Sequence, residues 1–412
     1  MRISNLLCSA CFAVLTTAAA AQIASAQAAA VAPAADGPYK IIAKEKVGGA
    51  GGSDYIYADS DGRKIYIARS AGRGGRGGRR GGAPAADAGG AAPAPAPAAA
   101  PGAATNRVDV YDIETLKLIG SVPTGRGGAH GAAVDPKSGH GFCSSNPVVM
   151  WDTKTLAPIK NIQLNGNPDG LLFDPGSGNV FIFSHSTPNC TAINAADGTI
   201  VKEFDLGGAP EQAQSDGNGK MYVDLEDKDS VAVVDTKTLA VTATYPVGDK
   251  GGGPGGLGFD AKNGVLFVMC QDPHTCVIMS AADGKVLDAL PIGAGTDGGG
   301  FNPNTMEAFS SNGQDGTLTI IKENSPTSFA VEQDLKTMPG AKVCTLDKKT
   351  DRILMFATEM LAPAAPSAAP PAAAPDAGGA APTARRGGRG GRGGRGRGTP
   401  APDGFTIFAA GK

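Results

Sequence analysis

Six polar side chains occupy one position of a repeating unit, and together they offer the chemistry of a carboxylate-rich site. Each lies five residues before an Asp or Asn that marks a turn, and Gly255 holds this position in the one remaining unit. If the side chains face a common space, crowding of like charges raises some carboxylate pKa values unless a cation is bound. Carboxylate oxygens suit Ca²⁺ or Mg²⁺, and an imidazole admits a transition metal. The six residues are Asp54, His130, Asp169, Glu211, Asp297 and Lys342.

A divalent cation is therefore one interpretation of these residues. The other is that they cap the starts of strands and hold water, in which case the protein has no cofactor. Sequence patterns of catalysis are otherwise absent, because the chain contains no HExxH, CxxCH, GxSxG or P-loop motif. Two further histidines, His185 and His274, fall in loops and are interpreted as solvated, with a contribution to a surface site as the alternative. The glycine-rich run Gly251–Gly256 is interpreted as a close turn.

A unit of four short strands repeats along the chain and predicts how the six side chains are positioned. In the fifth unit, strands are expected at 257–260, 265–270, 276–280 and 286–292, separated by turns that contain Asp, Asn and Gly. Periods of roughly 40 to 45 residues with strand-type content are typical of propeller blades, each of which buries its faces against a neighbour. The turn residues stand 39, 42, 44, 42 and 45 residues apart, at Asp135, Asp174, Asp216, Asp260, Asn302 and Asp347.

Seven units can be counted, and the chain is predicted to be an all-β, seven-bladed β-propeller of four-stranded antiparallel blades over residues 27–412. The first unit begins near Gly52 and resumes at Val108–Asp112 after an insertion. The seventh unit has only three strands near the C-terminus, so Tyr39–Val47 is expected to supply its outer strand and close the ring. Closure protects strand edges that would otherwise stay unpaired. In this geometry the six polar residues begin the innermost strands, at the mouth of the central channel.

The units resemble the YVTN (YncE-like) seven-bladed β-propeller repeat family. The family's strand motif is matched in pieces at Met221–Thr236 and Ala308–Ile321, although several units lack its Asn. The resemblance covers the chain after residue 26 apart from two insertions, and it implies the same fold. It implies no particular activity, because members of such a family do unrelated things on one scaffold.

The two insertions, at about 70–106 and 361–402, consist almost entirely of Ala, Pro, Gly and Arg and are expected to be disordered. Both interrupt the connection from the second to the third strand, in units that become neighbours when the ring closes, so both should leave the same face. Their net charges are +3 and +5, which leaves the rest of the chain near −10. The predicted anion-binding residues are Arg73, Arg76, Arg79, Arg80, Arg385, Arg386, Arg389, Arg392, Arg395 and Arg397.

Residues 1–26 have the pattern of an export signal, with an apolar stretch at Leu6–Ala20 and an A-x-A site at Ala24–Ala26. The sequence therefore predicts a periplasmic or secreted protein, and no later run is long and apolar enough to span a bilayer. Cys270 and Cys276 flank a short loop. A disulfide between them is one interpretation in an oxidising compartment, and small buried strand residues are the other.

The function expected from these features is that of a monomeric binding or scaffold protein. Its insertion-bearing face would hold an anionic polymer, such as a polysaccharide, a phosphorylated surface or extracellular DNA, or else an envelope protein. The alternative is a lactonase-like hydrolase or other enzyme that uses His130, Asp169, Glu211 and Asp297 at the channel mouth. A third interpretation is a hub for protein–protein interactions in which the insertions have no selected role.

Overall fold

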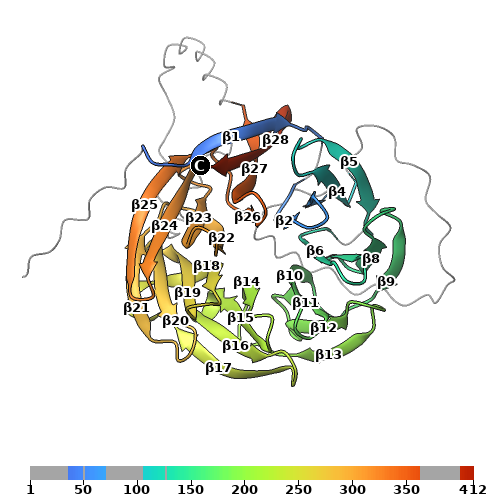
Figure 1. The fold of residues 1–412 in the computed structure, drawn as a ribbon. Helices are drawn as coiled ribbons and strands as arrows, with labels where there is room; N and C mark the ends of the chain where they lie inside the picture. Colours follow the sequence, from blue (N-terminus) through green and yellow to red (C-terminus); the bar gives the residue numbers. More distant parts are fainter. Residues whose placement is uncertain (1–35, 50–51, 71–104, 126–127, 362–399) are drawn as a thin grey trace, which may run out of the picture. The chain divides into compact units, whose positions relative to one another are not determined.

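The structure is a computed structural model, and it describes residues 36–49, 52–70, 105–125, 128–361 and 400–412. It is a seven-bladed β-propeller: seven four-stranded antiparallel sheets stand in a ring around a central channel (Figure 1). The fold class and the blade count predicted from the repeat are therefore confirmed. The predicted signal, residues 1–26, lies outside the described residues, as do most of the two insertions. Among the described residues, no helix is long and apolar enough to cross a membrane.

Six blades are built from consecutive strands, counted outward from the channel. Blade 1 contains β2 (Ile56–Asp59), β3 (Lys64–Arg69), β4 (Arg107–Asp112) and β5 (Leu118–Pro123). Blade 2 contains β6 (Ala132–Asp135), β7 (His140–Cys143), β8 (Val148–Asp152) and β9 (Pro158–Ile162). Blade 3 contains β10 (Pro168–Asp174), β11 (Asn179–Ser184), β12 (Cys190–Asn194) and β13 (Ile200–Phe204). Blade 4 contains β14 (Pro210–Ser215), β15 (Lys220–Leu225), β16 (Ser230–Asp235) and β17 (Ala240–Pro246).

Blade 5 contains β18 (Gly252–Asp260), β19 (Val265–Asp272), β20 (Thr275–Ser280) and β21 (Val286–Pro291). Blade 6 contains β22 (Thr296–Asn302), β23 (Glu307–Asn312), β24 (Thr317–Ser325) and β25 (Ser328–Lys336). Blade 7 joins β26 (Cys344–Asp347), β27 (Arg352–Met360) and β28 (Pro400–Gly411) to β1 (Lys40–Lys46), which comes from the other end of the chain. Two short 3₁₀ turns, η1 (Glu226–Lys228) and η2 (Gly248–Lys250), lie in loops.

The turns between strands have the chemistry that their sequences predict. After β6, the carboxylate of Asp135 accepts hydrogen bonds from the backbone amides of Lys137 and Ser138, and Gly139 takes a φ of 74°. After β4, Asp112 Oδ1 accepts a 2.8 Å hydrogen bond from the amide of Thr115, and Leu116 adopts a φ of 57°. A left-handed leucine is costly, but this one is 2% exposed and packs between blades 1 and 7, so tertiary contacts hold it there.

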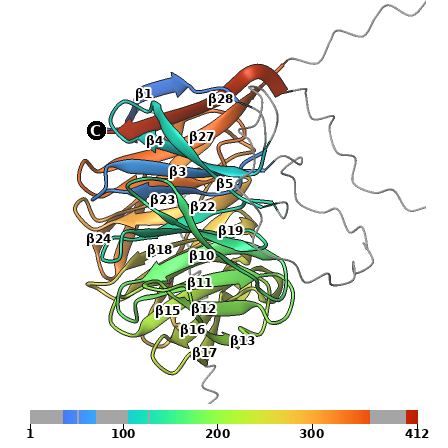
Figure 2. The ribbon, with the colours of Figure 1, turned by 90° about the vertical axis from the view of Figure 1, so that its right-hand side faces the viewer.

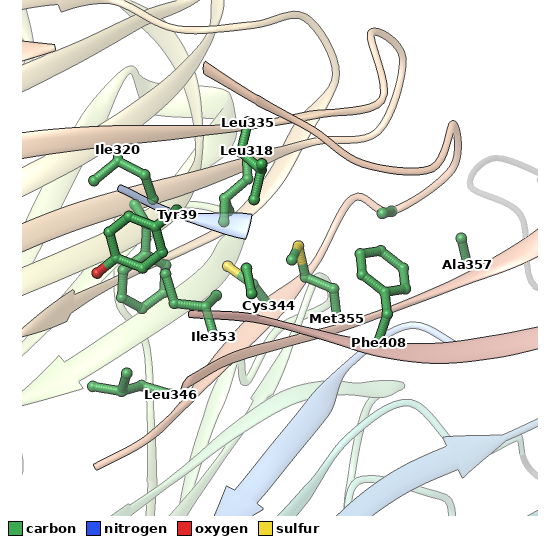
Figure 3. Close-up of a cluster of buried hydrophobic side chains, with 13 residues drawn as sticks. Tyr39, Leu318, Ile320, Leu335, Cys344, Leu346, Ile353, Met355, Ala357 and Phe408 are labelled. Atoms are coloured by element: carbon green, nitrogen blue, oxygen red, sulfur yellow. The ribbon is translucent and has the colours of Figure 1, made fainter. Parts of the chain in front are cut away.

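The ring closes through β1, as the three-stranded count of the seventh unit predicts. β1 pairs antiparallel with β28, with Lys40 opposite Gly411 and Lys46 opposite Thr406 (Figures 1 and 2). Tyr39, directly before β1, is 2% exposed and packs into the cluster of buried side chains between blades 6 and 7 (Figure 3). The other labelled members of this cluster are Leu318, Ile320, Leu335, Cys344, Leu346, Ile353, Met355, Ala357 and Phe408.

The glycine-rich run before Leu257 is strand rather than turn, so the close-turn interpretation is wrong. Its backbone pairs with β19, with Gly252 opposite Asp272. A Cβ placed at Gly256 would lie 2.7 Å from the backbone of Gly298 in the next blade. Glycine is therefore needed because the innermost strands of blades 5 and 6 approach closely.

The disulfide interpretation of Cys270 and Cys276 is not borne out, because both thiols are free. Cys270 packs into the interface of blades 4 and 5, whereas Cys276 packs into that of blades 5 and 6. Alternation along β19 and β20 thus places the two side chains on opposite faces of one sheet.

The five described cysteines are all buried and unpaired. We expect a thiol reagent to react with them on the order of a thousandfold more slowly than with an exposed thiol, in protein that begins at residue 27. This ratio corresponds to a free energy of about 4 kcal/mol for the local unfolding that exposes a buried thiol. Five equivalents should react after denaturation without reductant. Recovery of only three would mean that a disulfide forms after all.

Candidate functional site at the channel mouth

The six polar residues singled out in the sequence lie at the starts of the innermost strands. Asp169, Glu211 and Asp297 are the second residues of β10, β14 and β22, while Asp54 and His130 stand two residues before β2 and β6. Lys342 likewise stands two residues before β26. Because every blade starts its innermost strand at the same end of the channel, these side chains converge at one mouth.

Asp54 and Asp297 are bridged by the ammonium group of Lys342. Its Nζ lies 2.7 Å from Asp54 Oδ1 and also donates to Asp297 Oδ2. Burial alone would lower the pKa of Lys342, but the charges of Asp297 and Asp54 outweigh it and raise that pKa. Lys342 is therefore a fixed cation that links blades 6, 7 and 1.

The chain of contacts continues from Asp54 through two histidines. His130 Nδ1 lies 3.2 Å from Asp54 Oδ2 and 3.1 Å from Asp169 Oδ1. His185, which follows β11, has its Nε2 3.5 Å from Asp169 Oδ2 and 3.5 Å from Glu211 Oε1. Acids and bases thus alternate around six blades. This alternation of acidic and basic side chains is interrupted at blade 5, where Gly255 contributes no side chain.

His130 is held as an imidazolium by its two carboxylate neighbours. Burial by itself lowers the pKa of His130, but its close contacts with the carboxylates of Asp169 and Asp54 outweigh it and raise the pKa to about 10. In return, the hydrogen bond with His130 and the charge of Lys342 overcome burial and hold the pKa of Asp54 well below its usual range. At neutral pH His130 is a proton donor rather than a general base.

The blade 4 side of the ring is rich in carboxyl groups. Glu211 is 6% exposed, and burial, the charge of Asp297 and a hydrogen bond with Glu226 raise its pKa to about 8. Asp224, on β15, is fully buried, and neither of its carboxyl oxygens has a hydrogen-bond partner. Burial and the charge of Glu211 raise the pKa of Asp224 well above its usual value. Crowded, desolvated carboxyl groups of this kind take up protons or cations.

Two side chains cross the channel next to the ring. The side-chain oxygen of Gln212 accepts hydrogen bonds of 2.9 Å from the amides of Leu257 and Gly299, which tie blade 4 to blades 5 and 6. The hydroxyl group of Tyr55 donates to Glu211 Oε2 at 3.3 Å and ties blade 1 to blade 4. These bonds fix the inner strands relative to one another, so the ring is a rigid site.

Glu226 and Asp224 were not identified as site residues in the sequence, and His185 was interpreted as solvated, with a contribution to a surface site as the alternative. Each lies at or just beyond the end of a blade's second strand, which runs antiparallel to the first. The pairing of Pro168 with Ser184, and of Pro210 with Leu225, therefore brings them beside the ring. Comparing the blades at this second position as well as at the first would have found them.

The ten arginines predicted to bind anions lie outside the described residues, but the ends of both insertions are described. Arg69, the last residue of β3, is fully buried, and its guanidinium carbon lies 3.7 Å from the ring centroid of Phe405 on β28. Ser70 Oγ exchanges 2.8 Å hydrogen bonds with the backbone of Ala129, next to His130. The flanks of the two insertions therefore contact each other on the face that carries the channel mouth.

No protein-family model matches the chain, and no curated protein matches it.

Proposed function

We propose that the protein is a non-catalytic binding scaffold that uses its two arginine-rich insertions to hold an anionic polymer against one face of the propeller. The observation that carries this proposal is the contact between Arg69 and Phe405, which joins the flanks of the two insertions. The two insertions, which carry ten arginines at Arg73 to Arg80 and Arg385 to Arg397, therefore start from neighbouring points of the propeller rather than from opposite sides. A polymer can engage both groups at once, which raises its effective affinity without new contacts.

The distribution of charge supports the same proposal. Guanidinium groups form paired hydrogen bonds with phosphate, sulfate and carboxylate groups. The remainder of the chain is near −10 and carries the acidic ring at the channel mouth. That charge repels a polyanion, so contact is directed to the insertions. An exported protein would meet a polysaccharide, a phosphorylated surface or extracellular DNA, and we propose a periplasmic or secreted location on the strength of residues 1–26.

The hydrolase alternative receives less support from the geometry. Hydrolysis at the channel mouth requires a general base near neutral pH. With a pKa of about 10, His130 keeps its proton at that pH. The pKa of Glu211, about 8, likewise keeps that carboxyl group mostly protonated. A binding scaffold needs neither group as a base.

The proposal is tested by binding to heparin and to single-stranded DNA, measured as a function of salt. We expect affinity to fall roughly a thousandfold or more between 50 and 200 mM salt, as engagement of six to ten arginines would give. Replacing all ten arginines by glutamine should abolish this binding on both polymers. Replacing them by lysine keeps the charge and should preserve the steepness of the salt dependence.

The two polymers also separate the sources of the anion. A preference for heparin favours a sulfated or carboxylated polysaccharide, and a preference for DNA favours a phosphate polymer. If the glutamine variant binds as tightly as the original protein, the insertions do not carry the function. If the original protein and the glutamine variant then capture an envelope protein equally well, the propeller body is the protein-binding surface.

A further inference from the structure

We propose that Asp54, His130 and Asp169 form a binding site for one divalent first-row transition-metal ion, such as Zn²⁺. This site is separate from the polymer-binding role of the insertions, and either proposal can fail without the other. The three residues come from consecutive blades, and one potential ligand atom from each lies within 4.8 Å of the others. They are a mixed nitrogen and oxygen set rather than a patch of acids.

The distances from His130 Nδ1 to the two carboxylates fit such an ion. His130 Nδ1 stands 3.2 Å from Asp54 Oδ2 and 3.1 Å from Asp169 Oδ1. With metal–ligand bonds of about 2.1 Å, neighbouring ligand atoms stand about 3.0 Å apart in octahedral and about 3.4 Å apart in tetrahedral coordination. An ion can therefore be accommodated with small movements of the three side chains.

Hydrogen bonding within the protein leaves one of these atoms unsatisfied. A single N–H at Nδ1 can point to one carboxylate oxygen at a time, yet two lie within 3.2 Å of it. Asp169 Oδ1 is buried and makes no hydrogen bond of acceptable geometry. A buried carboxylate oxygen without a partner calls for a bound water or ion. A metal ion satisfies both oxygens and the nitrogen together, and it displaces the Nδ1 proton of His130 when it binds, because a histidine ligand must be deprotonated.

The surroundings orient the ligands and favour a cation. Lys342 binds Asp54 Oδ1, which leaves Oδ2 of the same carboxylate for the ion. His185 Nε2 lies 3.5 Å from Asp169 Oδ2, the oxygen that does not face His130. Such outer contacts fix the direction of metal ligands. The carboxylate of Asp297, which Lys342 also binds, adds negative charge nearby.

The ligand set also selects the class of ion. Imidazole with two carboxylates suits Zn²⁺, Mn²⁺ or Fe²⁺, whereas Ca²⁺ takes six to eight oxygen ligands and gains little from a nitrogen. Three protein ligands leave at least one coordination position for water.

The experiment uses untagged protein that has been stripped with EDTA, with metal content measured by mass spectrometry and Zn²⁺ affinity by calorimetry. We expect about one Zn²⁺ per chain, and a Co²⁺ complex with visible d–d absorption. His130→Ala should weaken Zn²⁺ binding about 100-fold or more, since a lost ligand costs at least as much as a lost outer contact. Asp169→Asn, which keeps the shape of the side chain, should do the same.

Matched controls are His140→Ala, at the opposite end of blade 2, and Asp61→Asn in an exposed turn. Both should leave Zn²⁺ affinity within about threefold, and circular dichroism should report the same fold for all four variants. If the original protein binds no stoichiometric Zn²⁺, or if His130→Ala and Asp169→Asn bind it as tightly as the controls, the proposal is wrong. Tight Ca²⁺ binding that survives His130→Ala would also overturn it.

Discussion

Replacing Tyr39 by alanine should lower the free energy of unfolding by about 3–5 kcal/mol, the cost of removing a large buried aromatic side chain. Tyr39 is 2% exposed and packs between blades 6 and 7. Its amide donates to Gln333 Oε1 at 2.9 Å, and Gln333 Nε2 donates back to its carbonyl oxygen at 3.0 Å. Its hydroxyl group donates to Glu307 Oε2 at 2.6 Å. Tyr39 thus fastens β1 to the ring of blades through both its backbone and its side chain. Tyr39→Ala removes only the side-chain contacts, and denaturant unfolding measures the loss.

Two further substitutions show which part of Tyr39 matters. Tyr39→Phe keeps the aromatic ring and removes only the hydrogen bond to Glu307, so it should lower the free energy of unfolding by about 1–2 kcal/mol. Ile42→Thr, on β1, changes a side chain that is 46% exposed and should cost about 0.5 kcal/mol or less. If Tyr39→Ala and Ile42→Thr destabilise the protein equally, β1 does not close the ring through its buried side.

Raising the pH from 5 to 8 should destabilise the protein in EDTA, and Glu211→Gln should remove much of this effect. The pKa of Glu211 is about 8 in the folded protein and about 4.5 when exposed. The folded state therefore holds a proton that the unfolded state has released. The stability due to this group is complete below pH 4.5 and is lost as the pH rises through 8. Given the neighbouring Asp169, Asp297 and Glu226, we expect a loss of about 1–3 kcal/mol.

The same reasoning extends the decline to higher pH. The pKa of His130 is raised from 6.5 to about 10, so its contribution is complete below pH 6.5 and is lost as the pH rises through 10. Glu211→Gln should consequently flatten the profile most between pH 5 and 6.5 and leave the decline above pH 6.5 that is due to His130. The control Glu45→Gln makes the same chemical change on the outer strand β1. A profile for Glu211→Gln that parallels that of Glu45→Gln would contradict the assignment.

Sequence reasoning predicted the blades well because their turns are determined locally. Asp135 and Gly139 specify their turn through hydrogen bonds and positive φ that nearby residues provide. The strand from the beginning of the chain was also predictable, since the seventh unit lacked one strand. The start of β18 was misjudged, because glycine favours turns locally. At Gly256 the deciding contact is with Gly298, one blade away, and no local rule reports it.

The site was predicted in part for the same reason. Residues at one repeat position meet at the axis by symmetry, so Asp54, His130 and Asp169 could be grouped from the sequence. The contacts among them could not be predicted, because they depend on how far each side chain reaches across the channel. His185 reaches Asp169 and Glu211 from a loop. Cys270 and Cys276 lie on opposite faces of the sheet because Cys276 pairs with Met269, the neighbour of Cys270. This pairing register could not be derived from the sequence of the two strands alone.

The pairing of β1 with β28 also determines the order of assembly. Blades 1 to 6 are each continuous stretches of chain apart from the insertion in blade 1, so they can form while synthesis proceeds. Blade 7 cannot be completed until residues 400–411 have left the ribosome. Contacts between such distant segments are entropically costly and form late. β1 must therefore wait until β28 has been made, and a nascent chain remains an open arc until then.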